Sequence, residues 1–108
     1  MLIYIAGPYT GKDKKETISN IAKARCLAHD CWEAGYATIC PHMNTAEFDD
    51  ISPEVFYIGD LEIMERCDCV LLIPGWEKSF GARLETRFAK KLGIPIYKSL
   101  DEIKRMHP

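Results

Sequence analysis

The segment "LIYIAGPYTGK", residues 2–12, decides the fold, because an apolar run typical of a buried strand leads into a glycine-containing loop before a helical pattern. The loop is not a Walker A motif. Gly7 and Gly11 enclose one residue too few, and Lys12 is followed by Asp13, a carboxylate where the motif needs a hydroxyl. A glycine loop between a first strand and a first helix still predicts a ligand-binding loop.

The same strand-to-helix alternation continues along the chain. Strands are expected at 2–6, 36–40, 69–74 and 95–98, and helices at 17–34, 53–66 and 81–92, with a short helix after residue 99. Such alternation predicts a three-layer α/β domain spanning residues 1–108, with a parallel sheet of about four strands covered on both faces. Ligands of such sheets bind at the carboxyl ends of the strands. We therefore expect the site on the loops 7–12, 41–50 and 74–81.

Composition narrows the class of protein. The 108 residues carry a net charge of -2 without a large basic block, so no polymeric nucleic acid is expected as partner. No apolar run approaches the ~20 residues that span a bilayer, and the first segment lacks a basic signal-peptide region. The five cysteines are odd in number and lack C-x-x-C spacing, which favours a reduced, cytoplasmic protein. A metal site built from cysteines and histidines is the weaker reading.

Two acidic residues occupy positions where apolar residues are expected. The helix at 53–66 has an apolar stripe of Phe56, Ile63, Met64 and Cys67, and Asp60 falls within about 60° of all of them. The helix at 81–92 has a stripe of Gly81, Ala82, Phe88, Ala89 and Leu92, with Glu85 among them. Burying an unpaired carboxylate costs several kcal/mol, so two such acids indicate a pocket. Alternatively, each acid braces a loop, and Glu85 also suits a first helical turn.

Paired carboxylates in different environments are typical of glycosidic-bond cleavage. Ser79 and Gly81, just before Glu85, place a hydroxyl and backbone amides where a sugar hydroxyl or a phosphate could bind, although Ser79 also suits a plain helix N-cap. Aromatic side chains on the loops could stack a base, or simply pack there. The candidate substrate-binding residues are Gly7, Tyr9, Thr10, Lys12, His42, Trp76, Ser79 and Gly81.

Three stretches, "YIAGPY", "GDLEIMERCDCVLLIPGW" and "SFGARLETRFAKKLGIPIY", resemble the nucleoside 2-deoxyribosyltransferase superfamily. The pattern is most similar to a branch of small bacterial and phage proteins, and the 2′-deoxynucleoside 5′-monophosphate N-hydrolase belongs to the same superfamily. The resemblance covers nearly the whole chain. It implies a flavodoxin-like (Rossmann-like) fold and a homo-oligomer whose sites borrow residues from a neighbouring copy.

The resemblance also implies roles for single residues. Glu85 matches the catalytic glutamate that attacks the anomeric carbon, and Asp60 matches the aspartate that works beside it on the base. Ser79 matches a serine that contacts the sugar phosphate in the hydrolase branch, and Tyr9 lies in a pocket loop. Two positions depart from that branch: Thr10 stands in place of a phosphate-binding arginine, with Lys12 nearby, and Arg83 stands in place of a glycine.

The function expected is cleavage or transfer at the N-glycosidic bond of a (deoxy)nucleoside or nucleotide, with Glu85 as nucleophile and with no cofactor or metal. Two alternatives stay open. In the first, the chain is a non-catalytic nucleotide-binding module in which Arg83 neutralises Glu85. In the second, it is a phosphoribohydrolase-like enzyme, since "PGWEKSFGARLE" (74–85) partly resembles the "PGG-x-G-T-x-x-E" motif of cytokinin-activating phosphoribohydrolases.

Overall fold

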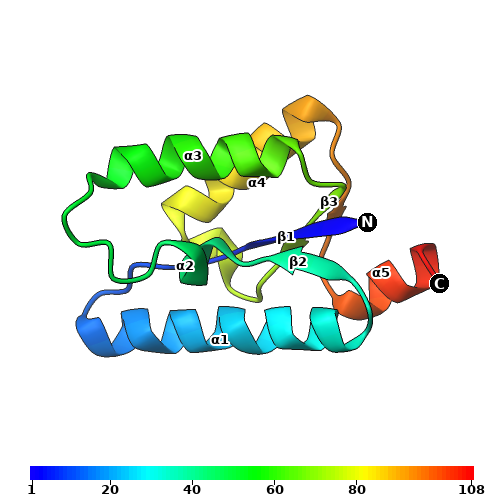
Figure 1. The fold of residues 1–108 in the computed structure, drawn as a ribbon, viewed down its shortest axis with the longest axis horizontal. Coiled ribbons are helices and arrows are strands. Elements are labelled where there is room, and N and C mark those ends of the chain that lie inside the picture. The colour runs from blue at the N-terminus through cyan, green and yellow to red at the C-terminus, as the bar shows by residue number, and fades with distance from the viewer.

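Four parallel strands form one sheet in the computed structural model, which describes residues 1–108 (Figure 1). The strands are β1 (Leu2–Ala6), β2 (Ala37–Ile39), β3 (Cys69–Leu72) and β4 (Ile96–Tyr97), in the order β2-β1-β3-β4. This is the flavodoxin-like order, and it confirms the predicted fold class. The chain runs outward from β1 to β2 and then crosses to the other side of β1, so the order of the strands switches between β1 and β3.

The helices are α1 (Lys14–Glu33), α2 (Pro41–Asn44), α3 (Pro53–Glu65), α4 (Phe80–Leu92) and α5 (Leu100–Met106), with a single 3-10 turn, η1 (Trp76–Lys78). Side chains of Asp13, Ser52, Ser79 and Ser99 cap the starts of α1, α3, α4 and α5. The first helix begins at Lys14 rather than at residue 17, because Asp13 Oδ1 accepts a hydrogen bond from the Glu16 amide at 2.8 Å.

Alternating side chains of the central strands build two separate cores. Ile3 and Ile5 of β1 point to the face covered by α1 and α5, where they join a buried cluster with Ala24 and Ile103. Tyr4 and Ala6 point to the opposite face and join a second cluster with residues of α3 and α4. Figure 1 shows α1 on one side of the sheet and α3 with α4 on the other. The helices that carry Asp60 and Glu85 therefore share one face with Tyr4.

None of the helices combines the length and the apolar character that crossing a membrane requires. The five cysteines are free thiols: Cys26 is exposed, and Cys31, Cys40, Cys67 and Cys69 are buried. Three of the buried cysteines belong to the core cluster under α1 and α5, where they act as small apolar side chains.

Candidate active site

Asp60 and Glu85 line one cavity of about 550 Å³ between α3, α4 and the loops at the carboxyl ends of β1 and β2. Asp60 enters it from the middle of α3 and Glu85 from the second turn of α4. The lining contains four acidic residues, Glu47, Asp49, Asp60 and Glu85, and no lysine or arginine. We call it the acidic cavity. Its other lining residues are Gly7, Tyr9, Thr10, Pro41, His42, Thr45, Phe48, Ile51, Pro53, Phe56, Tyr57 and Gly81.

The carboxyl group of Glu85 is held by the phenol of Tyr4. The Tyr4 hydroxyl donates a hydrogen bond to Glu85 Oε2, while Oε1 has no hydrogen-bond partner in the protein. Burial raises the pKa of Glu85 to about 7; the Tyr4 hydrogen bond opposes this rise and the nearby Asp60 adds to it. Glu85 is therefore fixed through one oxygen and changes its charge near neutral pH.

Tyr4 stays protonated and so remains a hydrogen-bond donor. Its side chain is fully buried in β1, and burial, followed by the negative charge of Glu85, raises the pKa of the phenol far above its ordinary value. The sequence predicts a buried strand at 2–6, and Tyr4 is not among the site residues that it indicates. The sequence does contain a signal for Tyr4. A buried tyrosine hydroxyl needs a hydrogen-bond partner, and the alternation of a strand places Tyr4 on the opposite face of the sheet from Ile3 and Ile5.

Asp60 makes no hydrogen bond or ion pair with any side chain. Partial burial raises the pKa of its carboxyl group to about 6. The side chains of Asp60 and Glu85 are both half-buried rather than exposed. Two neighbouring carboxyl groups with pKa values near neutrality can hold one proton between them at physiological pH.

The first loop and α2 form one wall of the acidic cavity. His42 lies 5% exposed, with its Nε2 at 2.9 Å from the carbonyl oxygen of Pro8. Because a carbonyl only accepts, Nε2 must donate this hydrogen bond, and burial lowers the pKa of the ring, which is therefore neutral at pH 7. The ring of Tyr9 packs against that of His42 at 5.7 Å between centroids. Two of the three predicted aromatic residues, Tyr9 and His42, thus lie in this wall.

Gly7 permits the close approach of β1 and β3 at the point where the order of the strands switches. A Cβ atom on Gly7 would lie 2.6 Å from the Cβ of Ile73, a distance that side chains do not adopt. The absence of a side chain lets the first loop begin directly above the end of β3.

A second wall comes from the segment 45–51 and the start of α3. It contributes Phe48 and Ile51, which are exposed, and Phe56 and Tyr57 from α3. The sequence analysis expected the loop 41–50 at the site but selected only His42 from it. No periodic pattern distinguishes a loop aromatic that faces a cavity from one that faces solvent, so Phe48 could not have been selected.

Three predicted site residues lie outside the acidic cavity. Lys12 and Ser79 line a neighbouring cavity of about 710 Å³, and Thr10 lies on the boundary because it lines both. Ser79 Oγ accepts a hydrogen bond from the Ala82 amide at 3.2 Å, so it is the N-cap of α4. Trp76 packs against the hydrophobic cluster under α3 and α4 and lines neither cavity. The structure therefore does not place Trp76 where it could stack a base.

The structure also contradicts the expectation that Arg83 neutralises Glu85. The Arg83 guanidinium donates a hydrogen bond to the carbonyl oxygen of Glu77 at 2.8 Å and lies over the ring of Phe80. The side chain is exposed and does not line the acidic cavity. The reason is helical spacing, because Arg83 and Glu85 are two residues apart and so project from different sides of α4.

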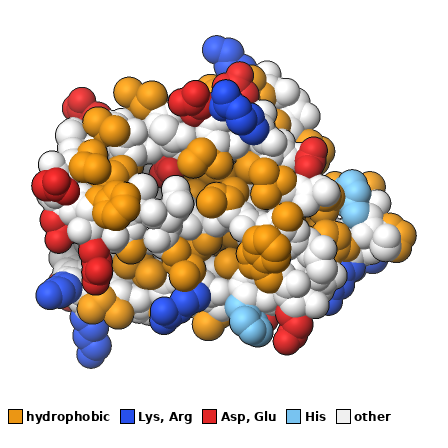
Figure 2. Space-filling model, in the orientation of Figure 1, with side chains coloured by type: hydrophobic (Ala, Val, Ile, Leu, Met, Phe, Trp, Pro, Cys, Tyr) orange, Lys and Arg blue, Asp and Glu red, His pale blue; other side chains and the backbone are white.

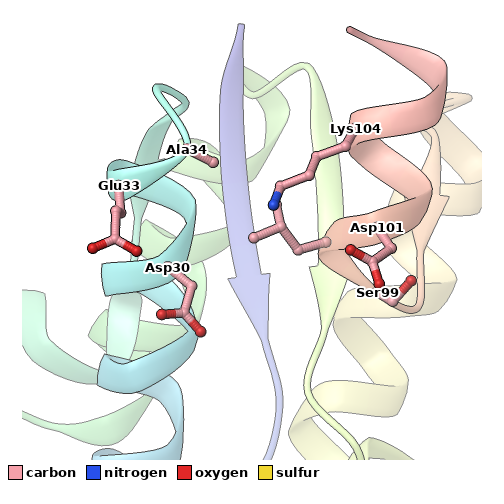
Figure 3. Close-up of a pocket in the computed structure, with 7 residues that line it drawn as sticks. Asp30, Glu33, Ala34, Ser99, Asp101 and Lys104 are labelled. Carbon is pink, nitrogen blue, oxygen red and sulfur yellow. The ribbon is translucent and has the colours of Figure 1, made fainter.

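A third cavity lies between the end of α1 and the start of α5, the two helices that cover the same face of the sheet. Figure 3 shows Asp30 and Glu33 on α1 facing Asp101 and Lys104 on α5. Its lining shares no residue with that of the acidic cavity. It contributes nothing to the acidic cavity.

Comparisons with known proteins agree with the fold. A family model described as "Domain of unknown function (DUF4406)" matches residues 1–98. No curated protein matches the chain. Among solved structures, the chain is similar to a 2-deoxyribosyltransferase from the psychrotolerant bacterium Bacillus psychrosaccharolyticus, with a TM-score of 0.63, 24% sequence identity, and coverage of 89% of this chain and 69% of that one. At this level of identity the similarity concerns the fold.

Proposed function

The chain belongs to the DUF4406 family, and we propose that it is an enzyme that cleaves or transfers at the N-glycosidic bond of a nucleoside or nucleotide, with Glu85 as nucleophile. The observation that carries the proposal is the grouping of Glu85, Tyr4 and Asp60 at one cavity. The similar solved structure is a 2-deoxyribosyltransferase described as a catalyst for nucleoside synthesis, which supports nucleosides as the substrate class.

The first chemical step belongs to Glu85. Its Oε1 atom, which accepts no hydrogen bond from the protein, attacks the anomeric carbon of the sugar, and the bond from that carbon to the base nitrogen breaks. The electron pair of that bond leaves with the base. Tyr4 keeps Oε2 in place during the attack, because a donor that cannot lose its own proton holds the carboxylate in one orientation.

Asp60 serves the departing base. Its carboxyl group has a pKa of about 6, so a fraction of the molecules carries a proton there at neutral pH. We assign to it the transfer of that proton to the base as the bond breaks, which is general acid catalysis. Water, or a second base, then attacks the anomeric carbon and releases Glu85. Water gives hydrolysis and a base gives transfer.

The charge of the acidic cavity suits this chemistry. Positive charge develops on the sugar ring during cleavage of a glycosidic bond. Four acidic residues line the cavity without a lysine or arginine to offset them, so the cavity favours that charge electrostatically. The aromatic side chains of Tyr9, Phe48 and Phe56 provide apolar surface for the base in the same cavity.

The proposal is tested by incubating the protein with deoxynucleosides, ribonucleosides and their 5′-phosphates, and measuring free base by chromatography. The test variant is Glu85→Gln, and the matched control is Glu65→Gln, an exposed acid on α3 outside the acidic cavity. We expect base release by the wild type and by the control, and a loss of about 10³-fold or more in Glu85→Gln. Equal release by all three proteins would refute the assignment of Glu85.

A further inference from the structure

The second cavity, which shares Thr10 with the acidic cavity, has the opposite electrostatic character. It is lined by four lysines, Lys12, Lys15, Lys23 and Lys78, and by two acids, Asp13 and Glu16. We call it the lysine cavity. Its other lining residues are Pro8, Thr10, Ser19, Asn20, Ile73, Pro74, Gly75 and Ser79. The whole chain has a net charge of -2, so this concentration of positive charge is local. Figure 2 shows lysine and arginine side chains over the start of α1.

The lysines of this cavity have no partners within the protein. The chain contains two ion pairs, His29–Asp30 and Arg66–Glu62, and neither involves a lysine. The two acids of the lining are engaged with backbone amides instead: Asp13 Oδ1 accepts from the Glu16 amide, and Glu16 Oε1 accepts from the Lys12 amide at 3.2 Å. Four ammonium groups around one hollow repel one another, and an anion between them would relieve that repulsion.

The lysine cavity joins the acidic cavity at the start of α4. Ser79 lines the lysine cavity and Gly81 lines the acidic cavity, while Thr10 lines both. The backbone amides of Phe80 and Gly81 have no hydrogen-bond partner in the protein, as is usual for the first turn of a helix. These two amides therefore remain free to donate a hydrogen bond to a ligand.

We propose that the lysine cavity binds a chain of two or three phosphates attached to the sugar whose glycosidic bond lies in the acidic cavity. This inference rests on the proposed function and names its substrate class: nucleotides that carry a 5′-diphosphate or 5′-triphosphate, or a pyrophosphate linked to a second group. The two cavities divide the substrate by charge, since the acidic cavity has four carboxyl groups and no lysine or arginine, whereas the lysine cavity has four lysines against two carboxyl groups.

The extent of the lysine cavity favours a phosphate chain over a single phosphate. Lys15 and Lys23 are eight residues apart on α1, which separates their Cα atoms by about 12 Å along the helix axis. Lys78 approaches from the η1 turn, on a different segment of the chain. A chain of phosphates can contact lysines along this length, whereas a single phosphate can contact only those at one end of it.

The test measures binding of inorganic phosphate, pyrophosphate and tripolyphosphate by isothermal titration calorimetry, without any nucleoside and without divalent cations. We expect tripolyphosphate to bind about tenfold or more tightly than inorganic phosphate, and its affinity to fall steeply with salt. Lys15→Ala, Lys23→Ala and Lys78→Ala should each weaken tripolyphosphate binding about threefold to tenfold. The control is Lys91→Ala, an exposed lysine on α4 that lines neither cavity, which should bind as the wild type does.

Equal affinity for the three anions, or equal weakening in Lys91→Ala, would overturn the inference. All four lysines chosen for substitution are exposed, so the variants should keep the melting temperature of the wild type. The outcome is separable from that of the proposed function. If the protein binds tripolyphosphate but releases no base, the anion site stands and the glycosidic chemistry is rejected. If base is released at the same rate from substrates with phosphate chains of different length, the chemistry stands and the phosphate site is rejected.

Discussion

Glu85→Gln should make the protein more stable at pH 8 while it abolishes activity. Burial raises the pKa of Glu85 from its ordinary 4.5 to about 7 in the folded protein. The folded state therefore holds this proton more tightly than the unfolded chain does. The free energy of unfolding must fall as the pH rises from about 4.5 to about 7, and it stays low above that range.

The size of the effect follows from the same two pKa values. The difference between 4.5 and about 7 corresponds to about 3 kcal/mol for a carboxyl group that is largely withdrawn from solvent. Glutamine carries no charge at any pH, and its side-chain oxygen can still accept the hydrogen bond of Tyr4. At pH 8 the variant should thus gain about 3 kcal/mol, or roughly 10–20 °C in melting temperature for a chain of this length.

The assay is urea denaturation followed by circular dichroism at pH 4 and pH 8, on the wild type, Glu85→Gln and the control Glu65→Gln. At pH 4 the wild type and Glu85→Gln should have similar free energies of unfolding, because Glu85 is then protonated in both the folded and the unfolded state. The control should differ from the wild type by less than about 0.5 kcal/mol at either pH. The reasoning is refuted if Glu85→Gln gains nothing at pH 8, or gains equally at both pH values.

Four further changes have defined outcomes. Tyr4→Phe should lower kcat about tenfold or more. The Tyr4 hydrogen bond lowers the pKa of Glu85, so its loss should raise that pKa and move the ascending limb of the pH–rate profile to higher pH; a limb that does not move would show that Tyr4 does not act on Glu85. Asp60→Asn should raise the free energy of unfolding above pH 6, by less than Glu85→Gln does because Asp60 is more exposed, and urea denaturation measures this gain. The same variant should release bases that are poor leaving groups more slowly, as chromatography of the free base would show. Gly7→Ala should destabilise by about 1–3 kcal/mol in thermal melts, because its Cβ would meet Ile73. Ile58 is 67% exposed on α3, so we expect it to lie in a contact between copies of a homo-oligomer. Ile58→Asp should then lower the molecular mass measured by light scattering, and a monomeric wild type would contradict this expectation.

The fold was predictable because each element carries its own local signal. Ser52 and Pro53 define the start of α3, Gly93 ends α4 with a φ of 74°, and the apolar run at 69–74 predicts a buried central strand. The ends of the strands were less predictable. β3 stops at Leu72 although the apolar run continues, because strand ends depend on the pairing partners rather than on the run itself.

The candidate site was predictable where a residue breaks a pattern. Asp60 and Glu85 are acids within apolar stripes, so helical periodicity alone selected them. Tyr4 was missed because a tyrosine in a buried strand fits the apolar pattern and does not break it. Residue type and loop position also favour Trp76, yet it is partly buried and packs against the core cluster under α3 and α4, since neither feature determines the direction of a side chain.

The division between the two cavities could not be obtained from the sequence. The sequence offers Lys12 as a binding residue, but Lys15, Lys23 and Lys78 look like ordinary solvated charges. Helical spacing does not reveal that the η1 turn brings Lys78 to the same cavity as α1. Contacts between residues far apart in the chain depend on how the loops fold over the sheet.

The most direct test of the account is to trap the sugar on Glu85. A substrate with fluorine at the 2′ carbon slows breakdown of a glycosyl ester, so the ester should accumulate when the protein is mixed with it. Intact-protein mass spectrometry should show an increase equal to one sugar unit, and peptide mapping should place it on Glu85, with no increase in Glu85→Gln. Release of base without any adduct, or an adduct on another residue, would contradict the assignment of Glu85 as the nucleophile.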